Sequence, residues 1–112
     1  MNKYRNKQKV IQGHVFDSKK ESERFLELRQ WKKMGKIAEL DLQPSFTLQG
    51  GFEDAQGKKH QPIIYFADFM YRDQKTGEVI VEDVKGIKTE VYRIKKKLFL
   101  YKYNLDYKFI ES

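Results

Sequence analysis

The chain has 112 residues, which is enough for one domain with a single modest core. It contains no cysteine, and its two histidines, His14 and His60, are far apart, which excludes a disulfide framework, a thiolate metal site and a recognisable zinc motif. The net charge of +7 favours an anionic partner. Because the amino terminus lacks the apolar core of a signal peptide and no apolar run is long enough to span a membrane, we expect a cytoplasmic protein that makes no membrane contact.

Charge is unevenly distributed along the chain. Residues 1–35 carry ten Lys/Arg against four acids, residues 36–86 carry six against nine, and residues 87–112 carry seven against three. Basic flanks around an acidic centre suit an enzyme that acts on a polyanion, with cations along the substrate track and carboxylates at a metal. The alternative is that the basic segments only keep the protein soluble.

The amino-terminal part predicts a flexible basic arm over residues 1–9, ahead of a single domain over residues 10–112. Residues 10–16 suit a short strand. A helix should follow, with Ser18 as N-cap and Glu21 three residues later in a capping-box arrangement, and it should end near Met34, with Gly35 in the C′ position.

Glu21 has two interpretations at the start of this helix. It lies four residues before Phe25 and seven before Leu28, which places it on the apolar face of the helix. It could therefore serve as a carboxylate of a metal site. Capping alone explains the Ser-x-x-Glu pattern equally well.

The middle of the chain predicts extended segments over residues 37–42 and 45–48, with Gln43 and Pro44 excluding helix between them. The polar stretch over residues 50–61 suits a surface loop or a hairpin tip, in which His60 should be solvated. A hairpin follows, with strands over residues 63–71 and 78–85 joined by a turn over residues 73–77.

Two acids should face each other across this hairpin. Side chains alternate between faces along a strand, and a turn centred on residues 75 and 76 sets Asp68 opposite Asp83. Opposed like charges destabilise a strand pair, so a divalent cation such as Mg²⁺ is the expected neutralising group. Lys85 shares the face of Asp83 and could orient a metal-activated water, whereas Glu82 points to the other face. The alternative is that Asp68 pairs with Lys85 or an arginine.

The carboxy-terminal part predicts a turn at Gly86, a helix capped by Thr89 over residues 90–103, and a strand over residues 107–110. This helix carries one apolar stripe on a strongly basic remainder. The stripe consists of Val91, Ile94, Leu98 and Tyr101. The elements together predict an α/β (α+β) fold, in which two helices flank a single mixed β-sheet.

The order αβββαβ, with Glu21 in the first helix, Asp68 on one strand and Asp83-Val84-Lys85 on the next, resembles the restriction-endonuclease-like core of the PD-(D/E)XK nuclease superfamily. More closely, the segments over residues 16–21, 42–44, 65–69 and 81–86 resemble a small phage and prophage family of endonuclease-like proteins that is catalogued as a domain of unknown function. Two positions depart from the superfamily pattern. Ala67 replaces the proline before the first acid, and the second acid is the shorter Asp83.

The resemblance implies a role for each matching residue. Asp68, Asp83 and Glu21 would be catalytic carboxylates that bind Mg²⁺ or Mn²⁺ together with Val84, and Lys85 would be the catalytic lysine. The second helix of such nucleases commonly contacts the phosphate. The residues that correspond to these substrate contacts are Tyr92, Lys95 and Lys96.

The expected function is a metal-dependent endonuclease that hydrolyses phosphodiesters in branched or replicative phage DNA, within the bacterial cytoplasm. Double-strand cleavage would require a homodimer, because one small domain carries one site. The alternative is a non-catalytic DNA-binding or recombination accessory protein on the same fold, which would bind DNA with a steep salt dependence and no metal requirement.

Overall fold

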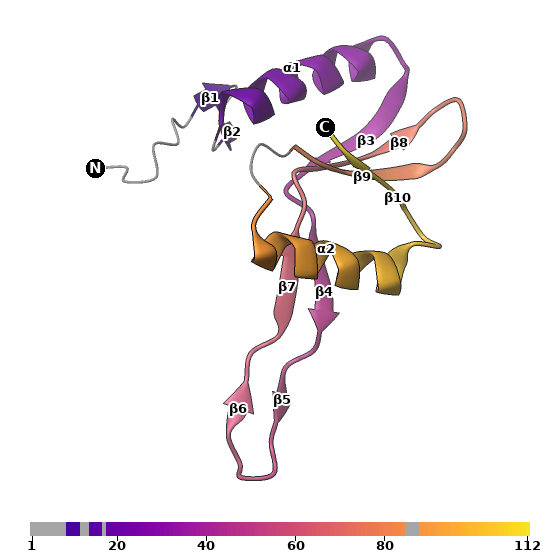
Figure 1. Ribbon diagram of the computed structural model, residues 1–112. Coiled ribbons are helices and arrows are strands. Elements are labelled where there is room, and N and C mark those ends of the chain that lie inside the picture. The colour runs from indigo at the N-terminus through magenta and orange to yellow at the C-terminus, as the bar shows by residue number, and fades with distance from the viewer. Residues whose placement is uncertain (1–8, 12–13, 17, 85–87) are drawn as a thin grey trace.

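The computed structural model describes residues 9–11, 14–16, 18–84 and 88–112 (Figure 1). The helices are α1 (Lys19–Lys33) and α2 (Glu90–Tyr103). The strands are β1 (Lys9–Ile11), β2 (His14–Phe16), β3 (Ile37–Leu42), β4 (Ser45–Gln49), β5 (Phe52–Glu53), β6 (Lys59–His60), β7 (Ile63–Phe66), β8 (Phe69–Asp73), β9 (Val79–Asp83) and β10 (Lys108–Glu111). The predicted arm over residues 1–9 lies outside the described residues except for Lys9.

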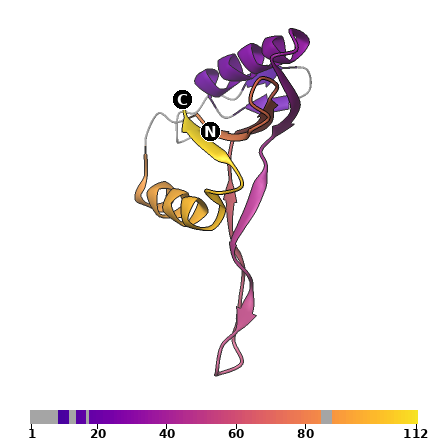
Figure 2. The ribbon, with the colours of Figure 1, turned by 90° about the vertical axis from the view of Figure 1, so that its right-hand side faces the viewer.

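Four strands form the main sheet, in the order β10-β9-β8-β3. β10 runs parallel to β9, and the other neighbours are antiparallel, so the sheet is mixed. The two helices lie on opposite sides of this sheet (Figures 1 and 2). The fold is therefore mixed α+β with two helices and a mixed sheet, as the sequence predicts.

Each face of the sheet has its own apolar cluster. On the α1 face, Phe25 and Leu28 of the helix pack with Phe69, Tyr71 and Ile80 of the sheet. The cluster on the α2 face consists of Phe46, Tyr65, Ala67, Val81, Tyr92 and Phe99. Ile80 and Val81 are neighbours in β9 and belong to different clusters, which is the alternation expected of a strand buried on both sides.

Helix α1 begins and ends where its local signals predict. The Ser18 hydroxyl accepts a hydrogen bond from the Glu21 backbone N–H at 3.1 Å and caps the first turn. At the other end, Met34 is the C-cap, and Gly35 adopts φ +75°, the left-handed conformation that glycine tolerates best.

A long β-arm departs from the sheet between β3 and β8 (Figures 1 and 2). Its base is the antiparallel pair β4–β7, and its tip is the pair β5–β6, so the predicted hairpin tip over residues 50–61 is confirmed. The prediction of one strand over residues 63–71 is wrong. The chain leaves the arm at Ala67, whose N–H donates to the Pro44 carbonyl at 3.1 Å, and enters the sheet at Phe69.

The sheet arrangement also departs from the predicted single sheet in its accessory strands. Besides the main sheet, the described residues form three two-stranded ribbons, β1–β2, β4–β7 and β5–β6. The sequence suits one strand over residues 10–16, but the described residues of this stretch belong to two antiparallel strands, β1 and β2. His60 in the arm tip is not simply solvated, because its Nε2 lies 2.8 Å from Asp54 Oδ2 and its ring stacks on Phe52.

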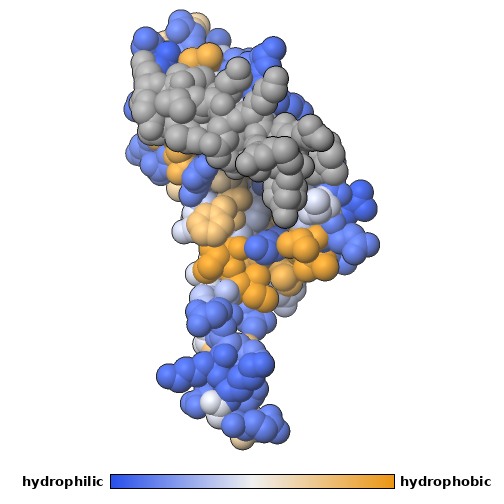
Figure 3. Space-filling model, turned by 90° about the vertical axis from the view of Figure 1, so that its left-hand side faces the viewer, coloured by the Kyte–Doolittle hydropathy of each residue, from blue (hydrophilic) through white to orange (hydrophobic). Residues whose placement is uncertain are grey.

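The core-facing side of α2 is not its apolar stripe. Val91, Ile94, Leu98 and Tyr101 are exposed, with relative exposures of 62%, 60%, 40% and 86%. Tyr92 and Phe99 are buried instead, against the aromatic cluster on that face of the sheet. Figure 3 shows the resulting apolar patch at the surface. Neither helix of the described part of the chain is long and apolar enough to cross a membrane.

Candidate functional site

The predicted opposition of two acids agrees with the strand register. Phe69 pairs with Glu82 and Met70 with Val81 in the antiparallel β8–β9 ladder. The Asp68 N–H donates to the Glu82 carbonyl at 3.1 Å, which continues the ladder by one residue. The next position along β9 is Asp83, so the side chains of Asp68 and Asp83 meet on the α2 face of the sheet.

The two carboxyl groups lie close enough to interact, and a neighbouring donor holds each of them. The charge of Asp83 acts on Asp68, whose Oδ2 accepts the Val84 backbone N–H at 2.6 Å. The Tyr65 hydroxyl donates to Asp83 Oδ2. Asp83 is fully buried, and Asp68 is half-buried at the break between β7 and β8. Asp68 is therefore the more accessible member of the pair.

Burial and like charges act together on Asp68. Burial, followed by the charges of Glu21 and Asp83, raises the pKa of Asp68 to about 8. Glu21 itself is buried in the first turn of α1, which places it on the predicted face. Within the described residues, however, no three carboxylate, imidazole or thiolate groups are grouped closely enough to form a complete metal site. In the structure, the charge of Glu21 is one of the causes that raise the pKa of Asp68.

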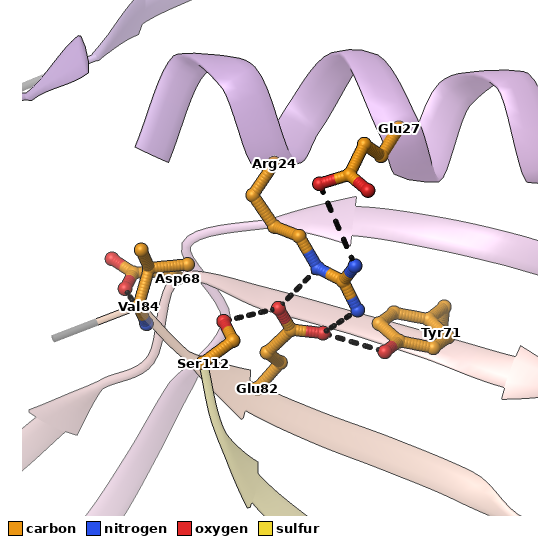
Figure 4. A network of polar contacts seen from close by, with 7 residues as sticks. All are labelled: Arg24, Glu27, Asp68, Tyr71, Glu82, Val84 and Ser112. Atoms are coloured by element: carbon orange, nitrogen blue, oxygen red, sulfur yellow. Dashed lines mark hydrogen bonds and ion pairs between the residues drawn. The ribbon is translucent and has the colours of Figure 1, made fainter. Parts of the chain in front are cut away.

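Glu82 lies on the opposite face of the sheet, as its position in the strand predicts. Arg24 of α1 clamps it with two bonds, from Nε to Oε2 at 2.6 Å and from Nη2 to Oε1 at 3.0 Å. The hydroxyls of Tyr71 and Ser112 complete the network, at 2.6 Å and 2.7 Å (Figure 4). Burial alone would raise the pKa of Glu82, but these hydrogen bonds lower it. The ion pair between Glu82 and Arg24 thus joins α1 to the sheet.

The predicted phosphate contacts on α2 are engaged inside the protein. The Tyr92 hydroxyl donates to Glu111 Oε2 at 2.5 Å, and Lys96 Nζ donates to Glu111 Oε1 at 2.8 Å. Lys95 Nζ donates to the Ile64 carbonyl at 2.9 Å. These contacts join α2 to β10 and to β7, so each of the three predicted residues has a structural role in the described molecule.

Lys85, the predicted catalytic lysine, lies outside the described residues, together with Gly86. The nearest described residue before it is Val84, whose N–H holds Asp68. The resemblance predicts Val84 among the metal ligands, and the backbone N–H of Val84 makes this hydrogen bond to Asp68 in the structure. The position of a lysine beside the carboxyl pair therefore stays a prediction.

Tyr65 and Glu111 are neighbours of the site that the sequence does not predict. Glu111 lies opposite Asp83 in the parallel β10–β9 ladder. Lys96 and Tyr92 hydrogen-bond to Glu111 and lower its pKa to about 2. Because β10 follows α2 and its register depends on how that helix packs, no local signal identifies Glu111. Tyr65 could have been found, because it precedes Asp68 by three residues within the same apolar run.

One cavity of the described molecule lies away from the carboxyl pair. It has a volume of about 740 Å³ and is lined by residues of α1 and of the sheet, among them Arg24, Trp31, Tyr71, Ile80 and Ile110. Ile80 belongs to the α1 face, opposite to that of Asp83. Because the Asp68–Asp83 pair is the cluster of ionisable side chains that the sequence singles out, we place the candidate site at the pair and not in this cavity.

The geometry defines a mixed α+β domain with a largely buried carboxyl pair where its two central strands meet. Residues 1–110 match a family model described as "Protein of unknown function (DUF1064)". The chain belongs to this family, which confirms the resemblance to a family catalogued as a domain of unknown function. No match was found among curated proteins or among solved structures.

Proposed function

We propose that the protein is a metal-dependent DNA endonuclease built on the restriction-endonuclease-like core of the PD-(D/E)XK superfamily. The observation that carries this proposal is the Asp68–Asp83 pair. Two carboxyl groups lie together in a largely buried setting, beside the charge of Glu21. Such an arrangement is costly for folding and is typical of sites that bind a cation or move a proton.

The donor set at the pair suits Mg²⁺ or Mn²⁺. Asp68 and Asp83 supply hard oxygen atoms, which these cations prefer, and Mg²⁺ commonly binds through one or two carboxylates plus water and phosphate. Glu21 and Val84 are the further proposed ligands. Bound there, the cation would polarise a phosphodiester and lower the pKa of a water molecule.

The chain's own residues would prepare the site for this role. The Val84 N–H and the Tyr65 hydroxyl each hold one carboxyl group, and such support keeps ligands in a productive orientation. In the proposal, Lys85 orients the attacking water or stabilises charge on the phosphate. Tyr92, Lys95 and Lys96 could bind DNA only by exchanging their present protein partners for phosphate oxygens.

Phage or prophage DNA in the bacterial cytoplasm, branched or replicating, is the proposed substrate. The net charge of +7 supports a polyanionic partner. One active site cuts one strand, so cleavage of both strands would require a homodimer.

The test is cleavage of supercoiled plasmid and of a synthetic branched DNA in Mg²⁺, in Mn²⁺ and in chelator. Asp83→Asn keeps the side-chain shape and an oxygen acceptor for Tyr65 but removes the carboxylate. We expect metal-dependent nicking that falls to background in this variant. Asp41→Asn removes an exposed carboxylate from β3 and serves as the matched control with full activity. Undiminished cleavage by Asp83→Asn would reject the proposal.

A second candidate is a non-catalytic DNA-binding accessory protein on the same fold. Two observations favour it: Asp83 is fully buried, and Lys95 and Lys96 are already bonded within the protein. This candidate predicts DNA binding in chelator as tight as in Mg²⁺, with no cleavage of either DNA under any metal condition.

A further inference from the structure

The exposed face of α2 has the residue spacing of a helix–helix seam. Val91, Ile94, Leu98 and Tyr101 follow one another at intervals of three, four and three residues, which is the a/d spacing of a coiled coil. All four are exposed, and the opposite side of the helix is the one that packs on the sheet. The helix therefore presents an unpartnered apolar stripe of about two heptads.

Strand β7 supplies a wall beside this stripe. A groove of about 410 Å³ runs between the two elements. Its lining residues are Pro62, Ile63, Ile64, Val91, Ile94, Lys95 and Leu98. Figure 3 shows the apolar surface over this region, bordered by the hydrophilic tip of the β-arm. A groove with one helical wall and regularly spaced apolar residues is a common binding site for an amphipathic helix.

The charges beside the stripe are mostly positive. Lys95 and Lys102 flank it on the side of the β-arm, where their Nζ atoms donate to the carbonyls of Ile64 and Thr47. Arg93 and Lys97 flank it on the other side and are exposed, with Glu90 at the start of the helix. Within the described part of the chain, no ion pair joins any of these four cations to an acid.

These charges argue against a second copy of the chain on the stripe. Antiparallel pairing of two α2 helices would bring Lys95 of one against Lys102 of the other, and like charges at such flanking positions destabilise helix pairs. DNA is also a poor match, because an apolar stripe offers its phosphates no hydrogen-bond donor. An acidic partner turns the same cations into favourable contacts.

We propose that the groove between α2 and β7 binds an amphipathic helix of a partner protein, with apolar residues at heptad spacing and acidic residues on both flanks. The apolar residues would cover Val91, Ile94 and Leu98, and the acids would pair with Lys95, Lys97 and Lys102. The groove does not include the Asp68–Asp83 pair, but it shares Lys95 with the proposed DNA contacts, so the test below uses peptides in the absence of DNA.

The test uses two labelled synthetic peptides, each about three heptads long, with identical Leu and Ile at the a and d positions. One carries Glu at the flanking positions and the other carries Lys. Binding to the full-length protein is followed by fluorescence anisotropy at low and at high salt. We expect the Glu peptide to bind at least about tenfold more tightly than the Lys peptide, and the difference to shrink at high salt.

Variants locate the binding surface. Ile94→Asp should reduce the affinity for the Glu peptide by at least about tenfold. Lys97→Glu should reduce the preference for the Glu peptide over the Lys peptide. Leu105→Asp, at an equally apolar and more exposed position beyond the end of α2, should change nothing. Circular dichroism shows whether each variant retains its helices.

Three results would overturn the proposal. The first is that neither peptide binds, and the second is that both bind equally. The third is a dimer in sedimentation velocity that Ile94→Asp converts to monomer, because the stripe would then be a homodimer interface.

Discussion

Glu82 and Asp83 are adjacent in β9, and their surroundings are electrostatically opposite. Glu82 faces α1 and is bound by Arg24, whereas Asp83 faces α2 and lies beside the carboxyl group of Asp68. Strand alternation produces this separation, since consecutive side chains point to opposite faces. Glu82 therefore stabilises the fold through an ion pair, whereas Asp83 lies beside a second acid, Asp68.

The first prediction at this scale concerns Glu82→Gln. The variant removes one partner of a largely buried ion pair and leaves Arg24 with only the exposed Glu27 at 3.8 Å, so we expect a loss of about 3 kcal/mol in the free energy of unfolding at neutral pH. Because the pKa of Glu82 is lowered in the folded state, its contribution is present above the usual value of 4.5 and is lost as pH falls through the folded pKa. The difference from wild type should therefore shrink in acid.

Denaturant unfolding at neutral and at acidic pH measures this effect. Glu39→Gln is the matched control, because it breaks the exposed ion pair of Glu39 with Arg72 at 3.2 Å and should cost at most about 1 kcal/mol. If the two variants were equally stable at neutral pH, the Arg24–Glu82 ion pair would contribute no more to stability than the exposed Glu39–Arg72 pair.

Asp68 should contribute a pH dependence of the opposite sign. Its pKa is raised to about 8, so the folded state holds a proton that the unfolded chain releases near pH 4. Its contribution to stability is therefore complete below about pH 4 and is lost as pH rises towards 8, by up to about 1.4 kcal/mol per pH unit. In chelator, Asp68→Asn should flatten this decline. If the difference in the free energy of unfolding between wild type and Asp68→Asn were the same at pH 5 and at pH 8, the raised pKa of Asp68 would be contradicted.

Elements with strong local signals match their predictions, and elements defined by packing do not. Helix α1 has an N-cap at Ser18 and a left-handed glycine at Gly35, and the turn before β9 has Gly77 at φ +78°. Local chemistry determines these features, so the sequence reveals both the helix bounds and the register that brings Asp68 to Asp83.

Helix α2 shows why the remainder could not be predicted. The Thr89 cap predicts where the helix begins, but the apolar stripe of the helix is not the side that packs on the core. Tyr92 and Phe99 pack on an aromatic cluster that includes Phe46 and Tyr65 of the β-arm. The arm pairs residues distant in sequence. No local pattern indicates that its aromatic residues pack against Tyr92 and Phe99 and leave Ile94 and Leu98 exposed. The roles of Glu111, Lys95 and Lys96 depend on the same packing.

At the scale of the whole molecule, the acids of the candidate site lie in a chain that is basic overall. The described molecule measures 55 × 41 × 23 Å, and its radius of gyration of 16.2 Å exceeds the roughly 13 Å expected of a compact chain of this length. The projecting β-arm accounts for much of this extension (Figure 2). An extended basic molecule can contact many phosphates while the carboxyl pair remains confined to one place.

DNA affinity should therefore depend strongly on salt and only partly on single cations. In chelator, the logarithm of the association constant should fall linearly with the logarithm of salt concentration, with a slope of about −0.9 per neutralised phosphate. Arg93→Gln removes an exposed cation next to Tyr92 and should reduce the slope by about 1, whereas Lys75→Gln, in the turn on the side of the 740 Å³ cavity, should leave it unchanged. Fluorescence anisotropy of a labelled duplex over a salt series measures both slopes. Salt-independent binding, or equal slopes for wild type and Arg93→Gln, would mean that the basic surface of α2 does not face the DNA.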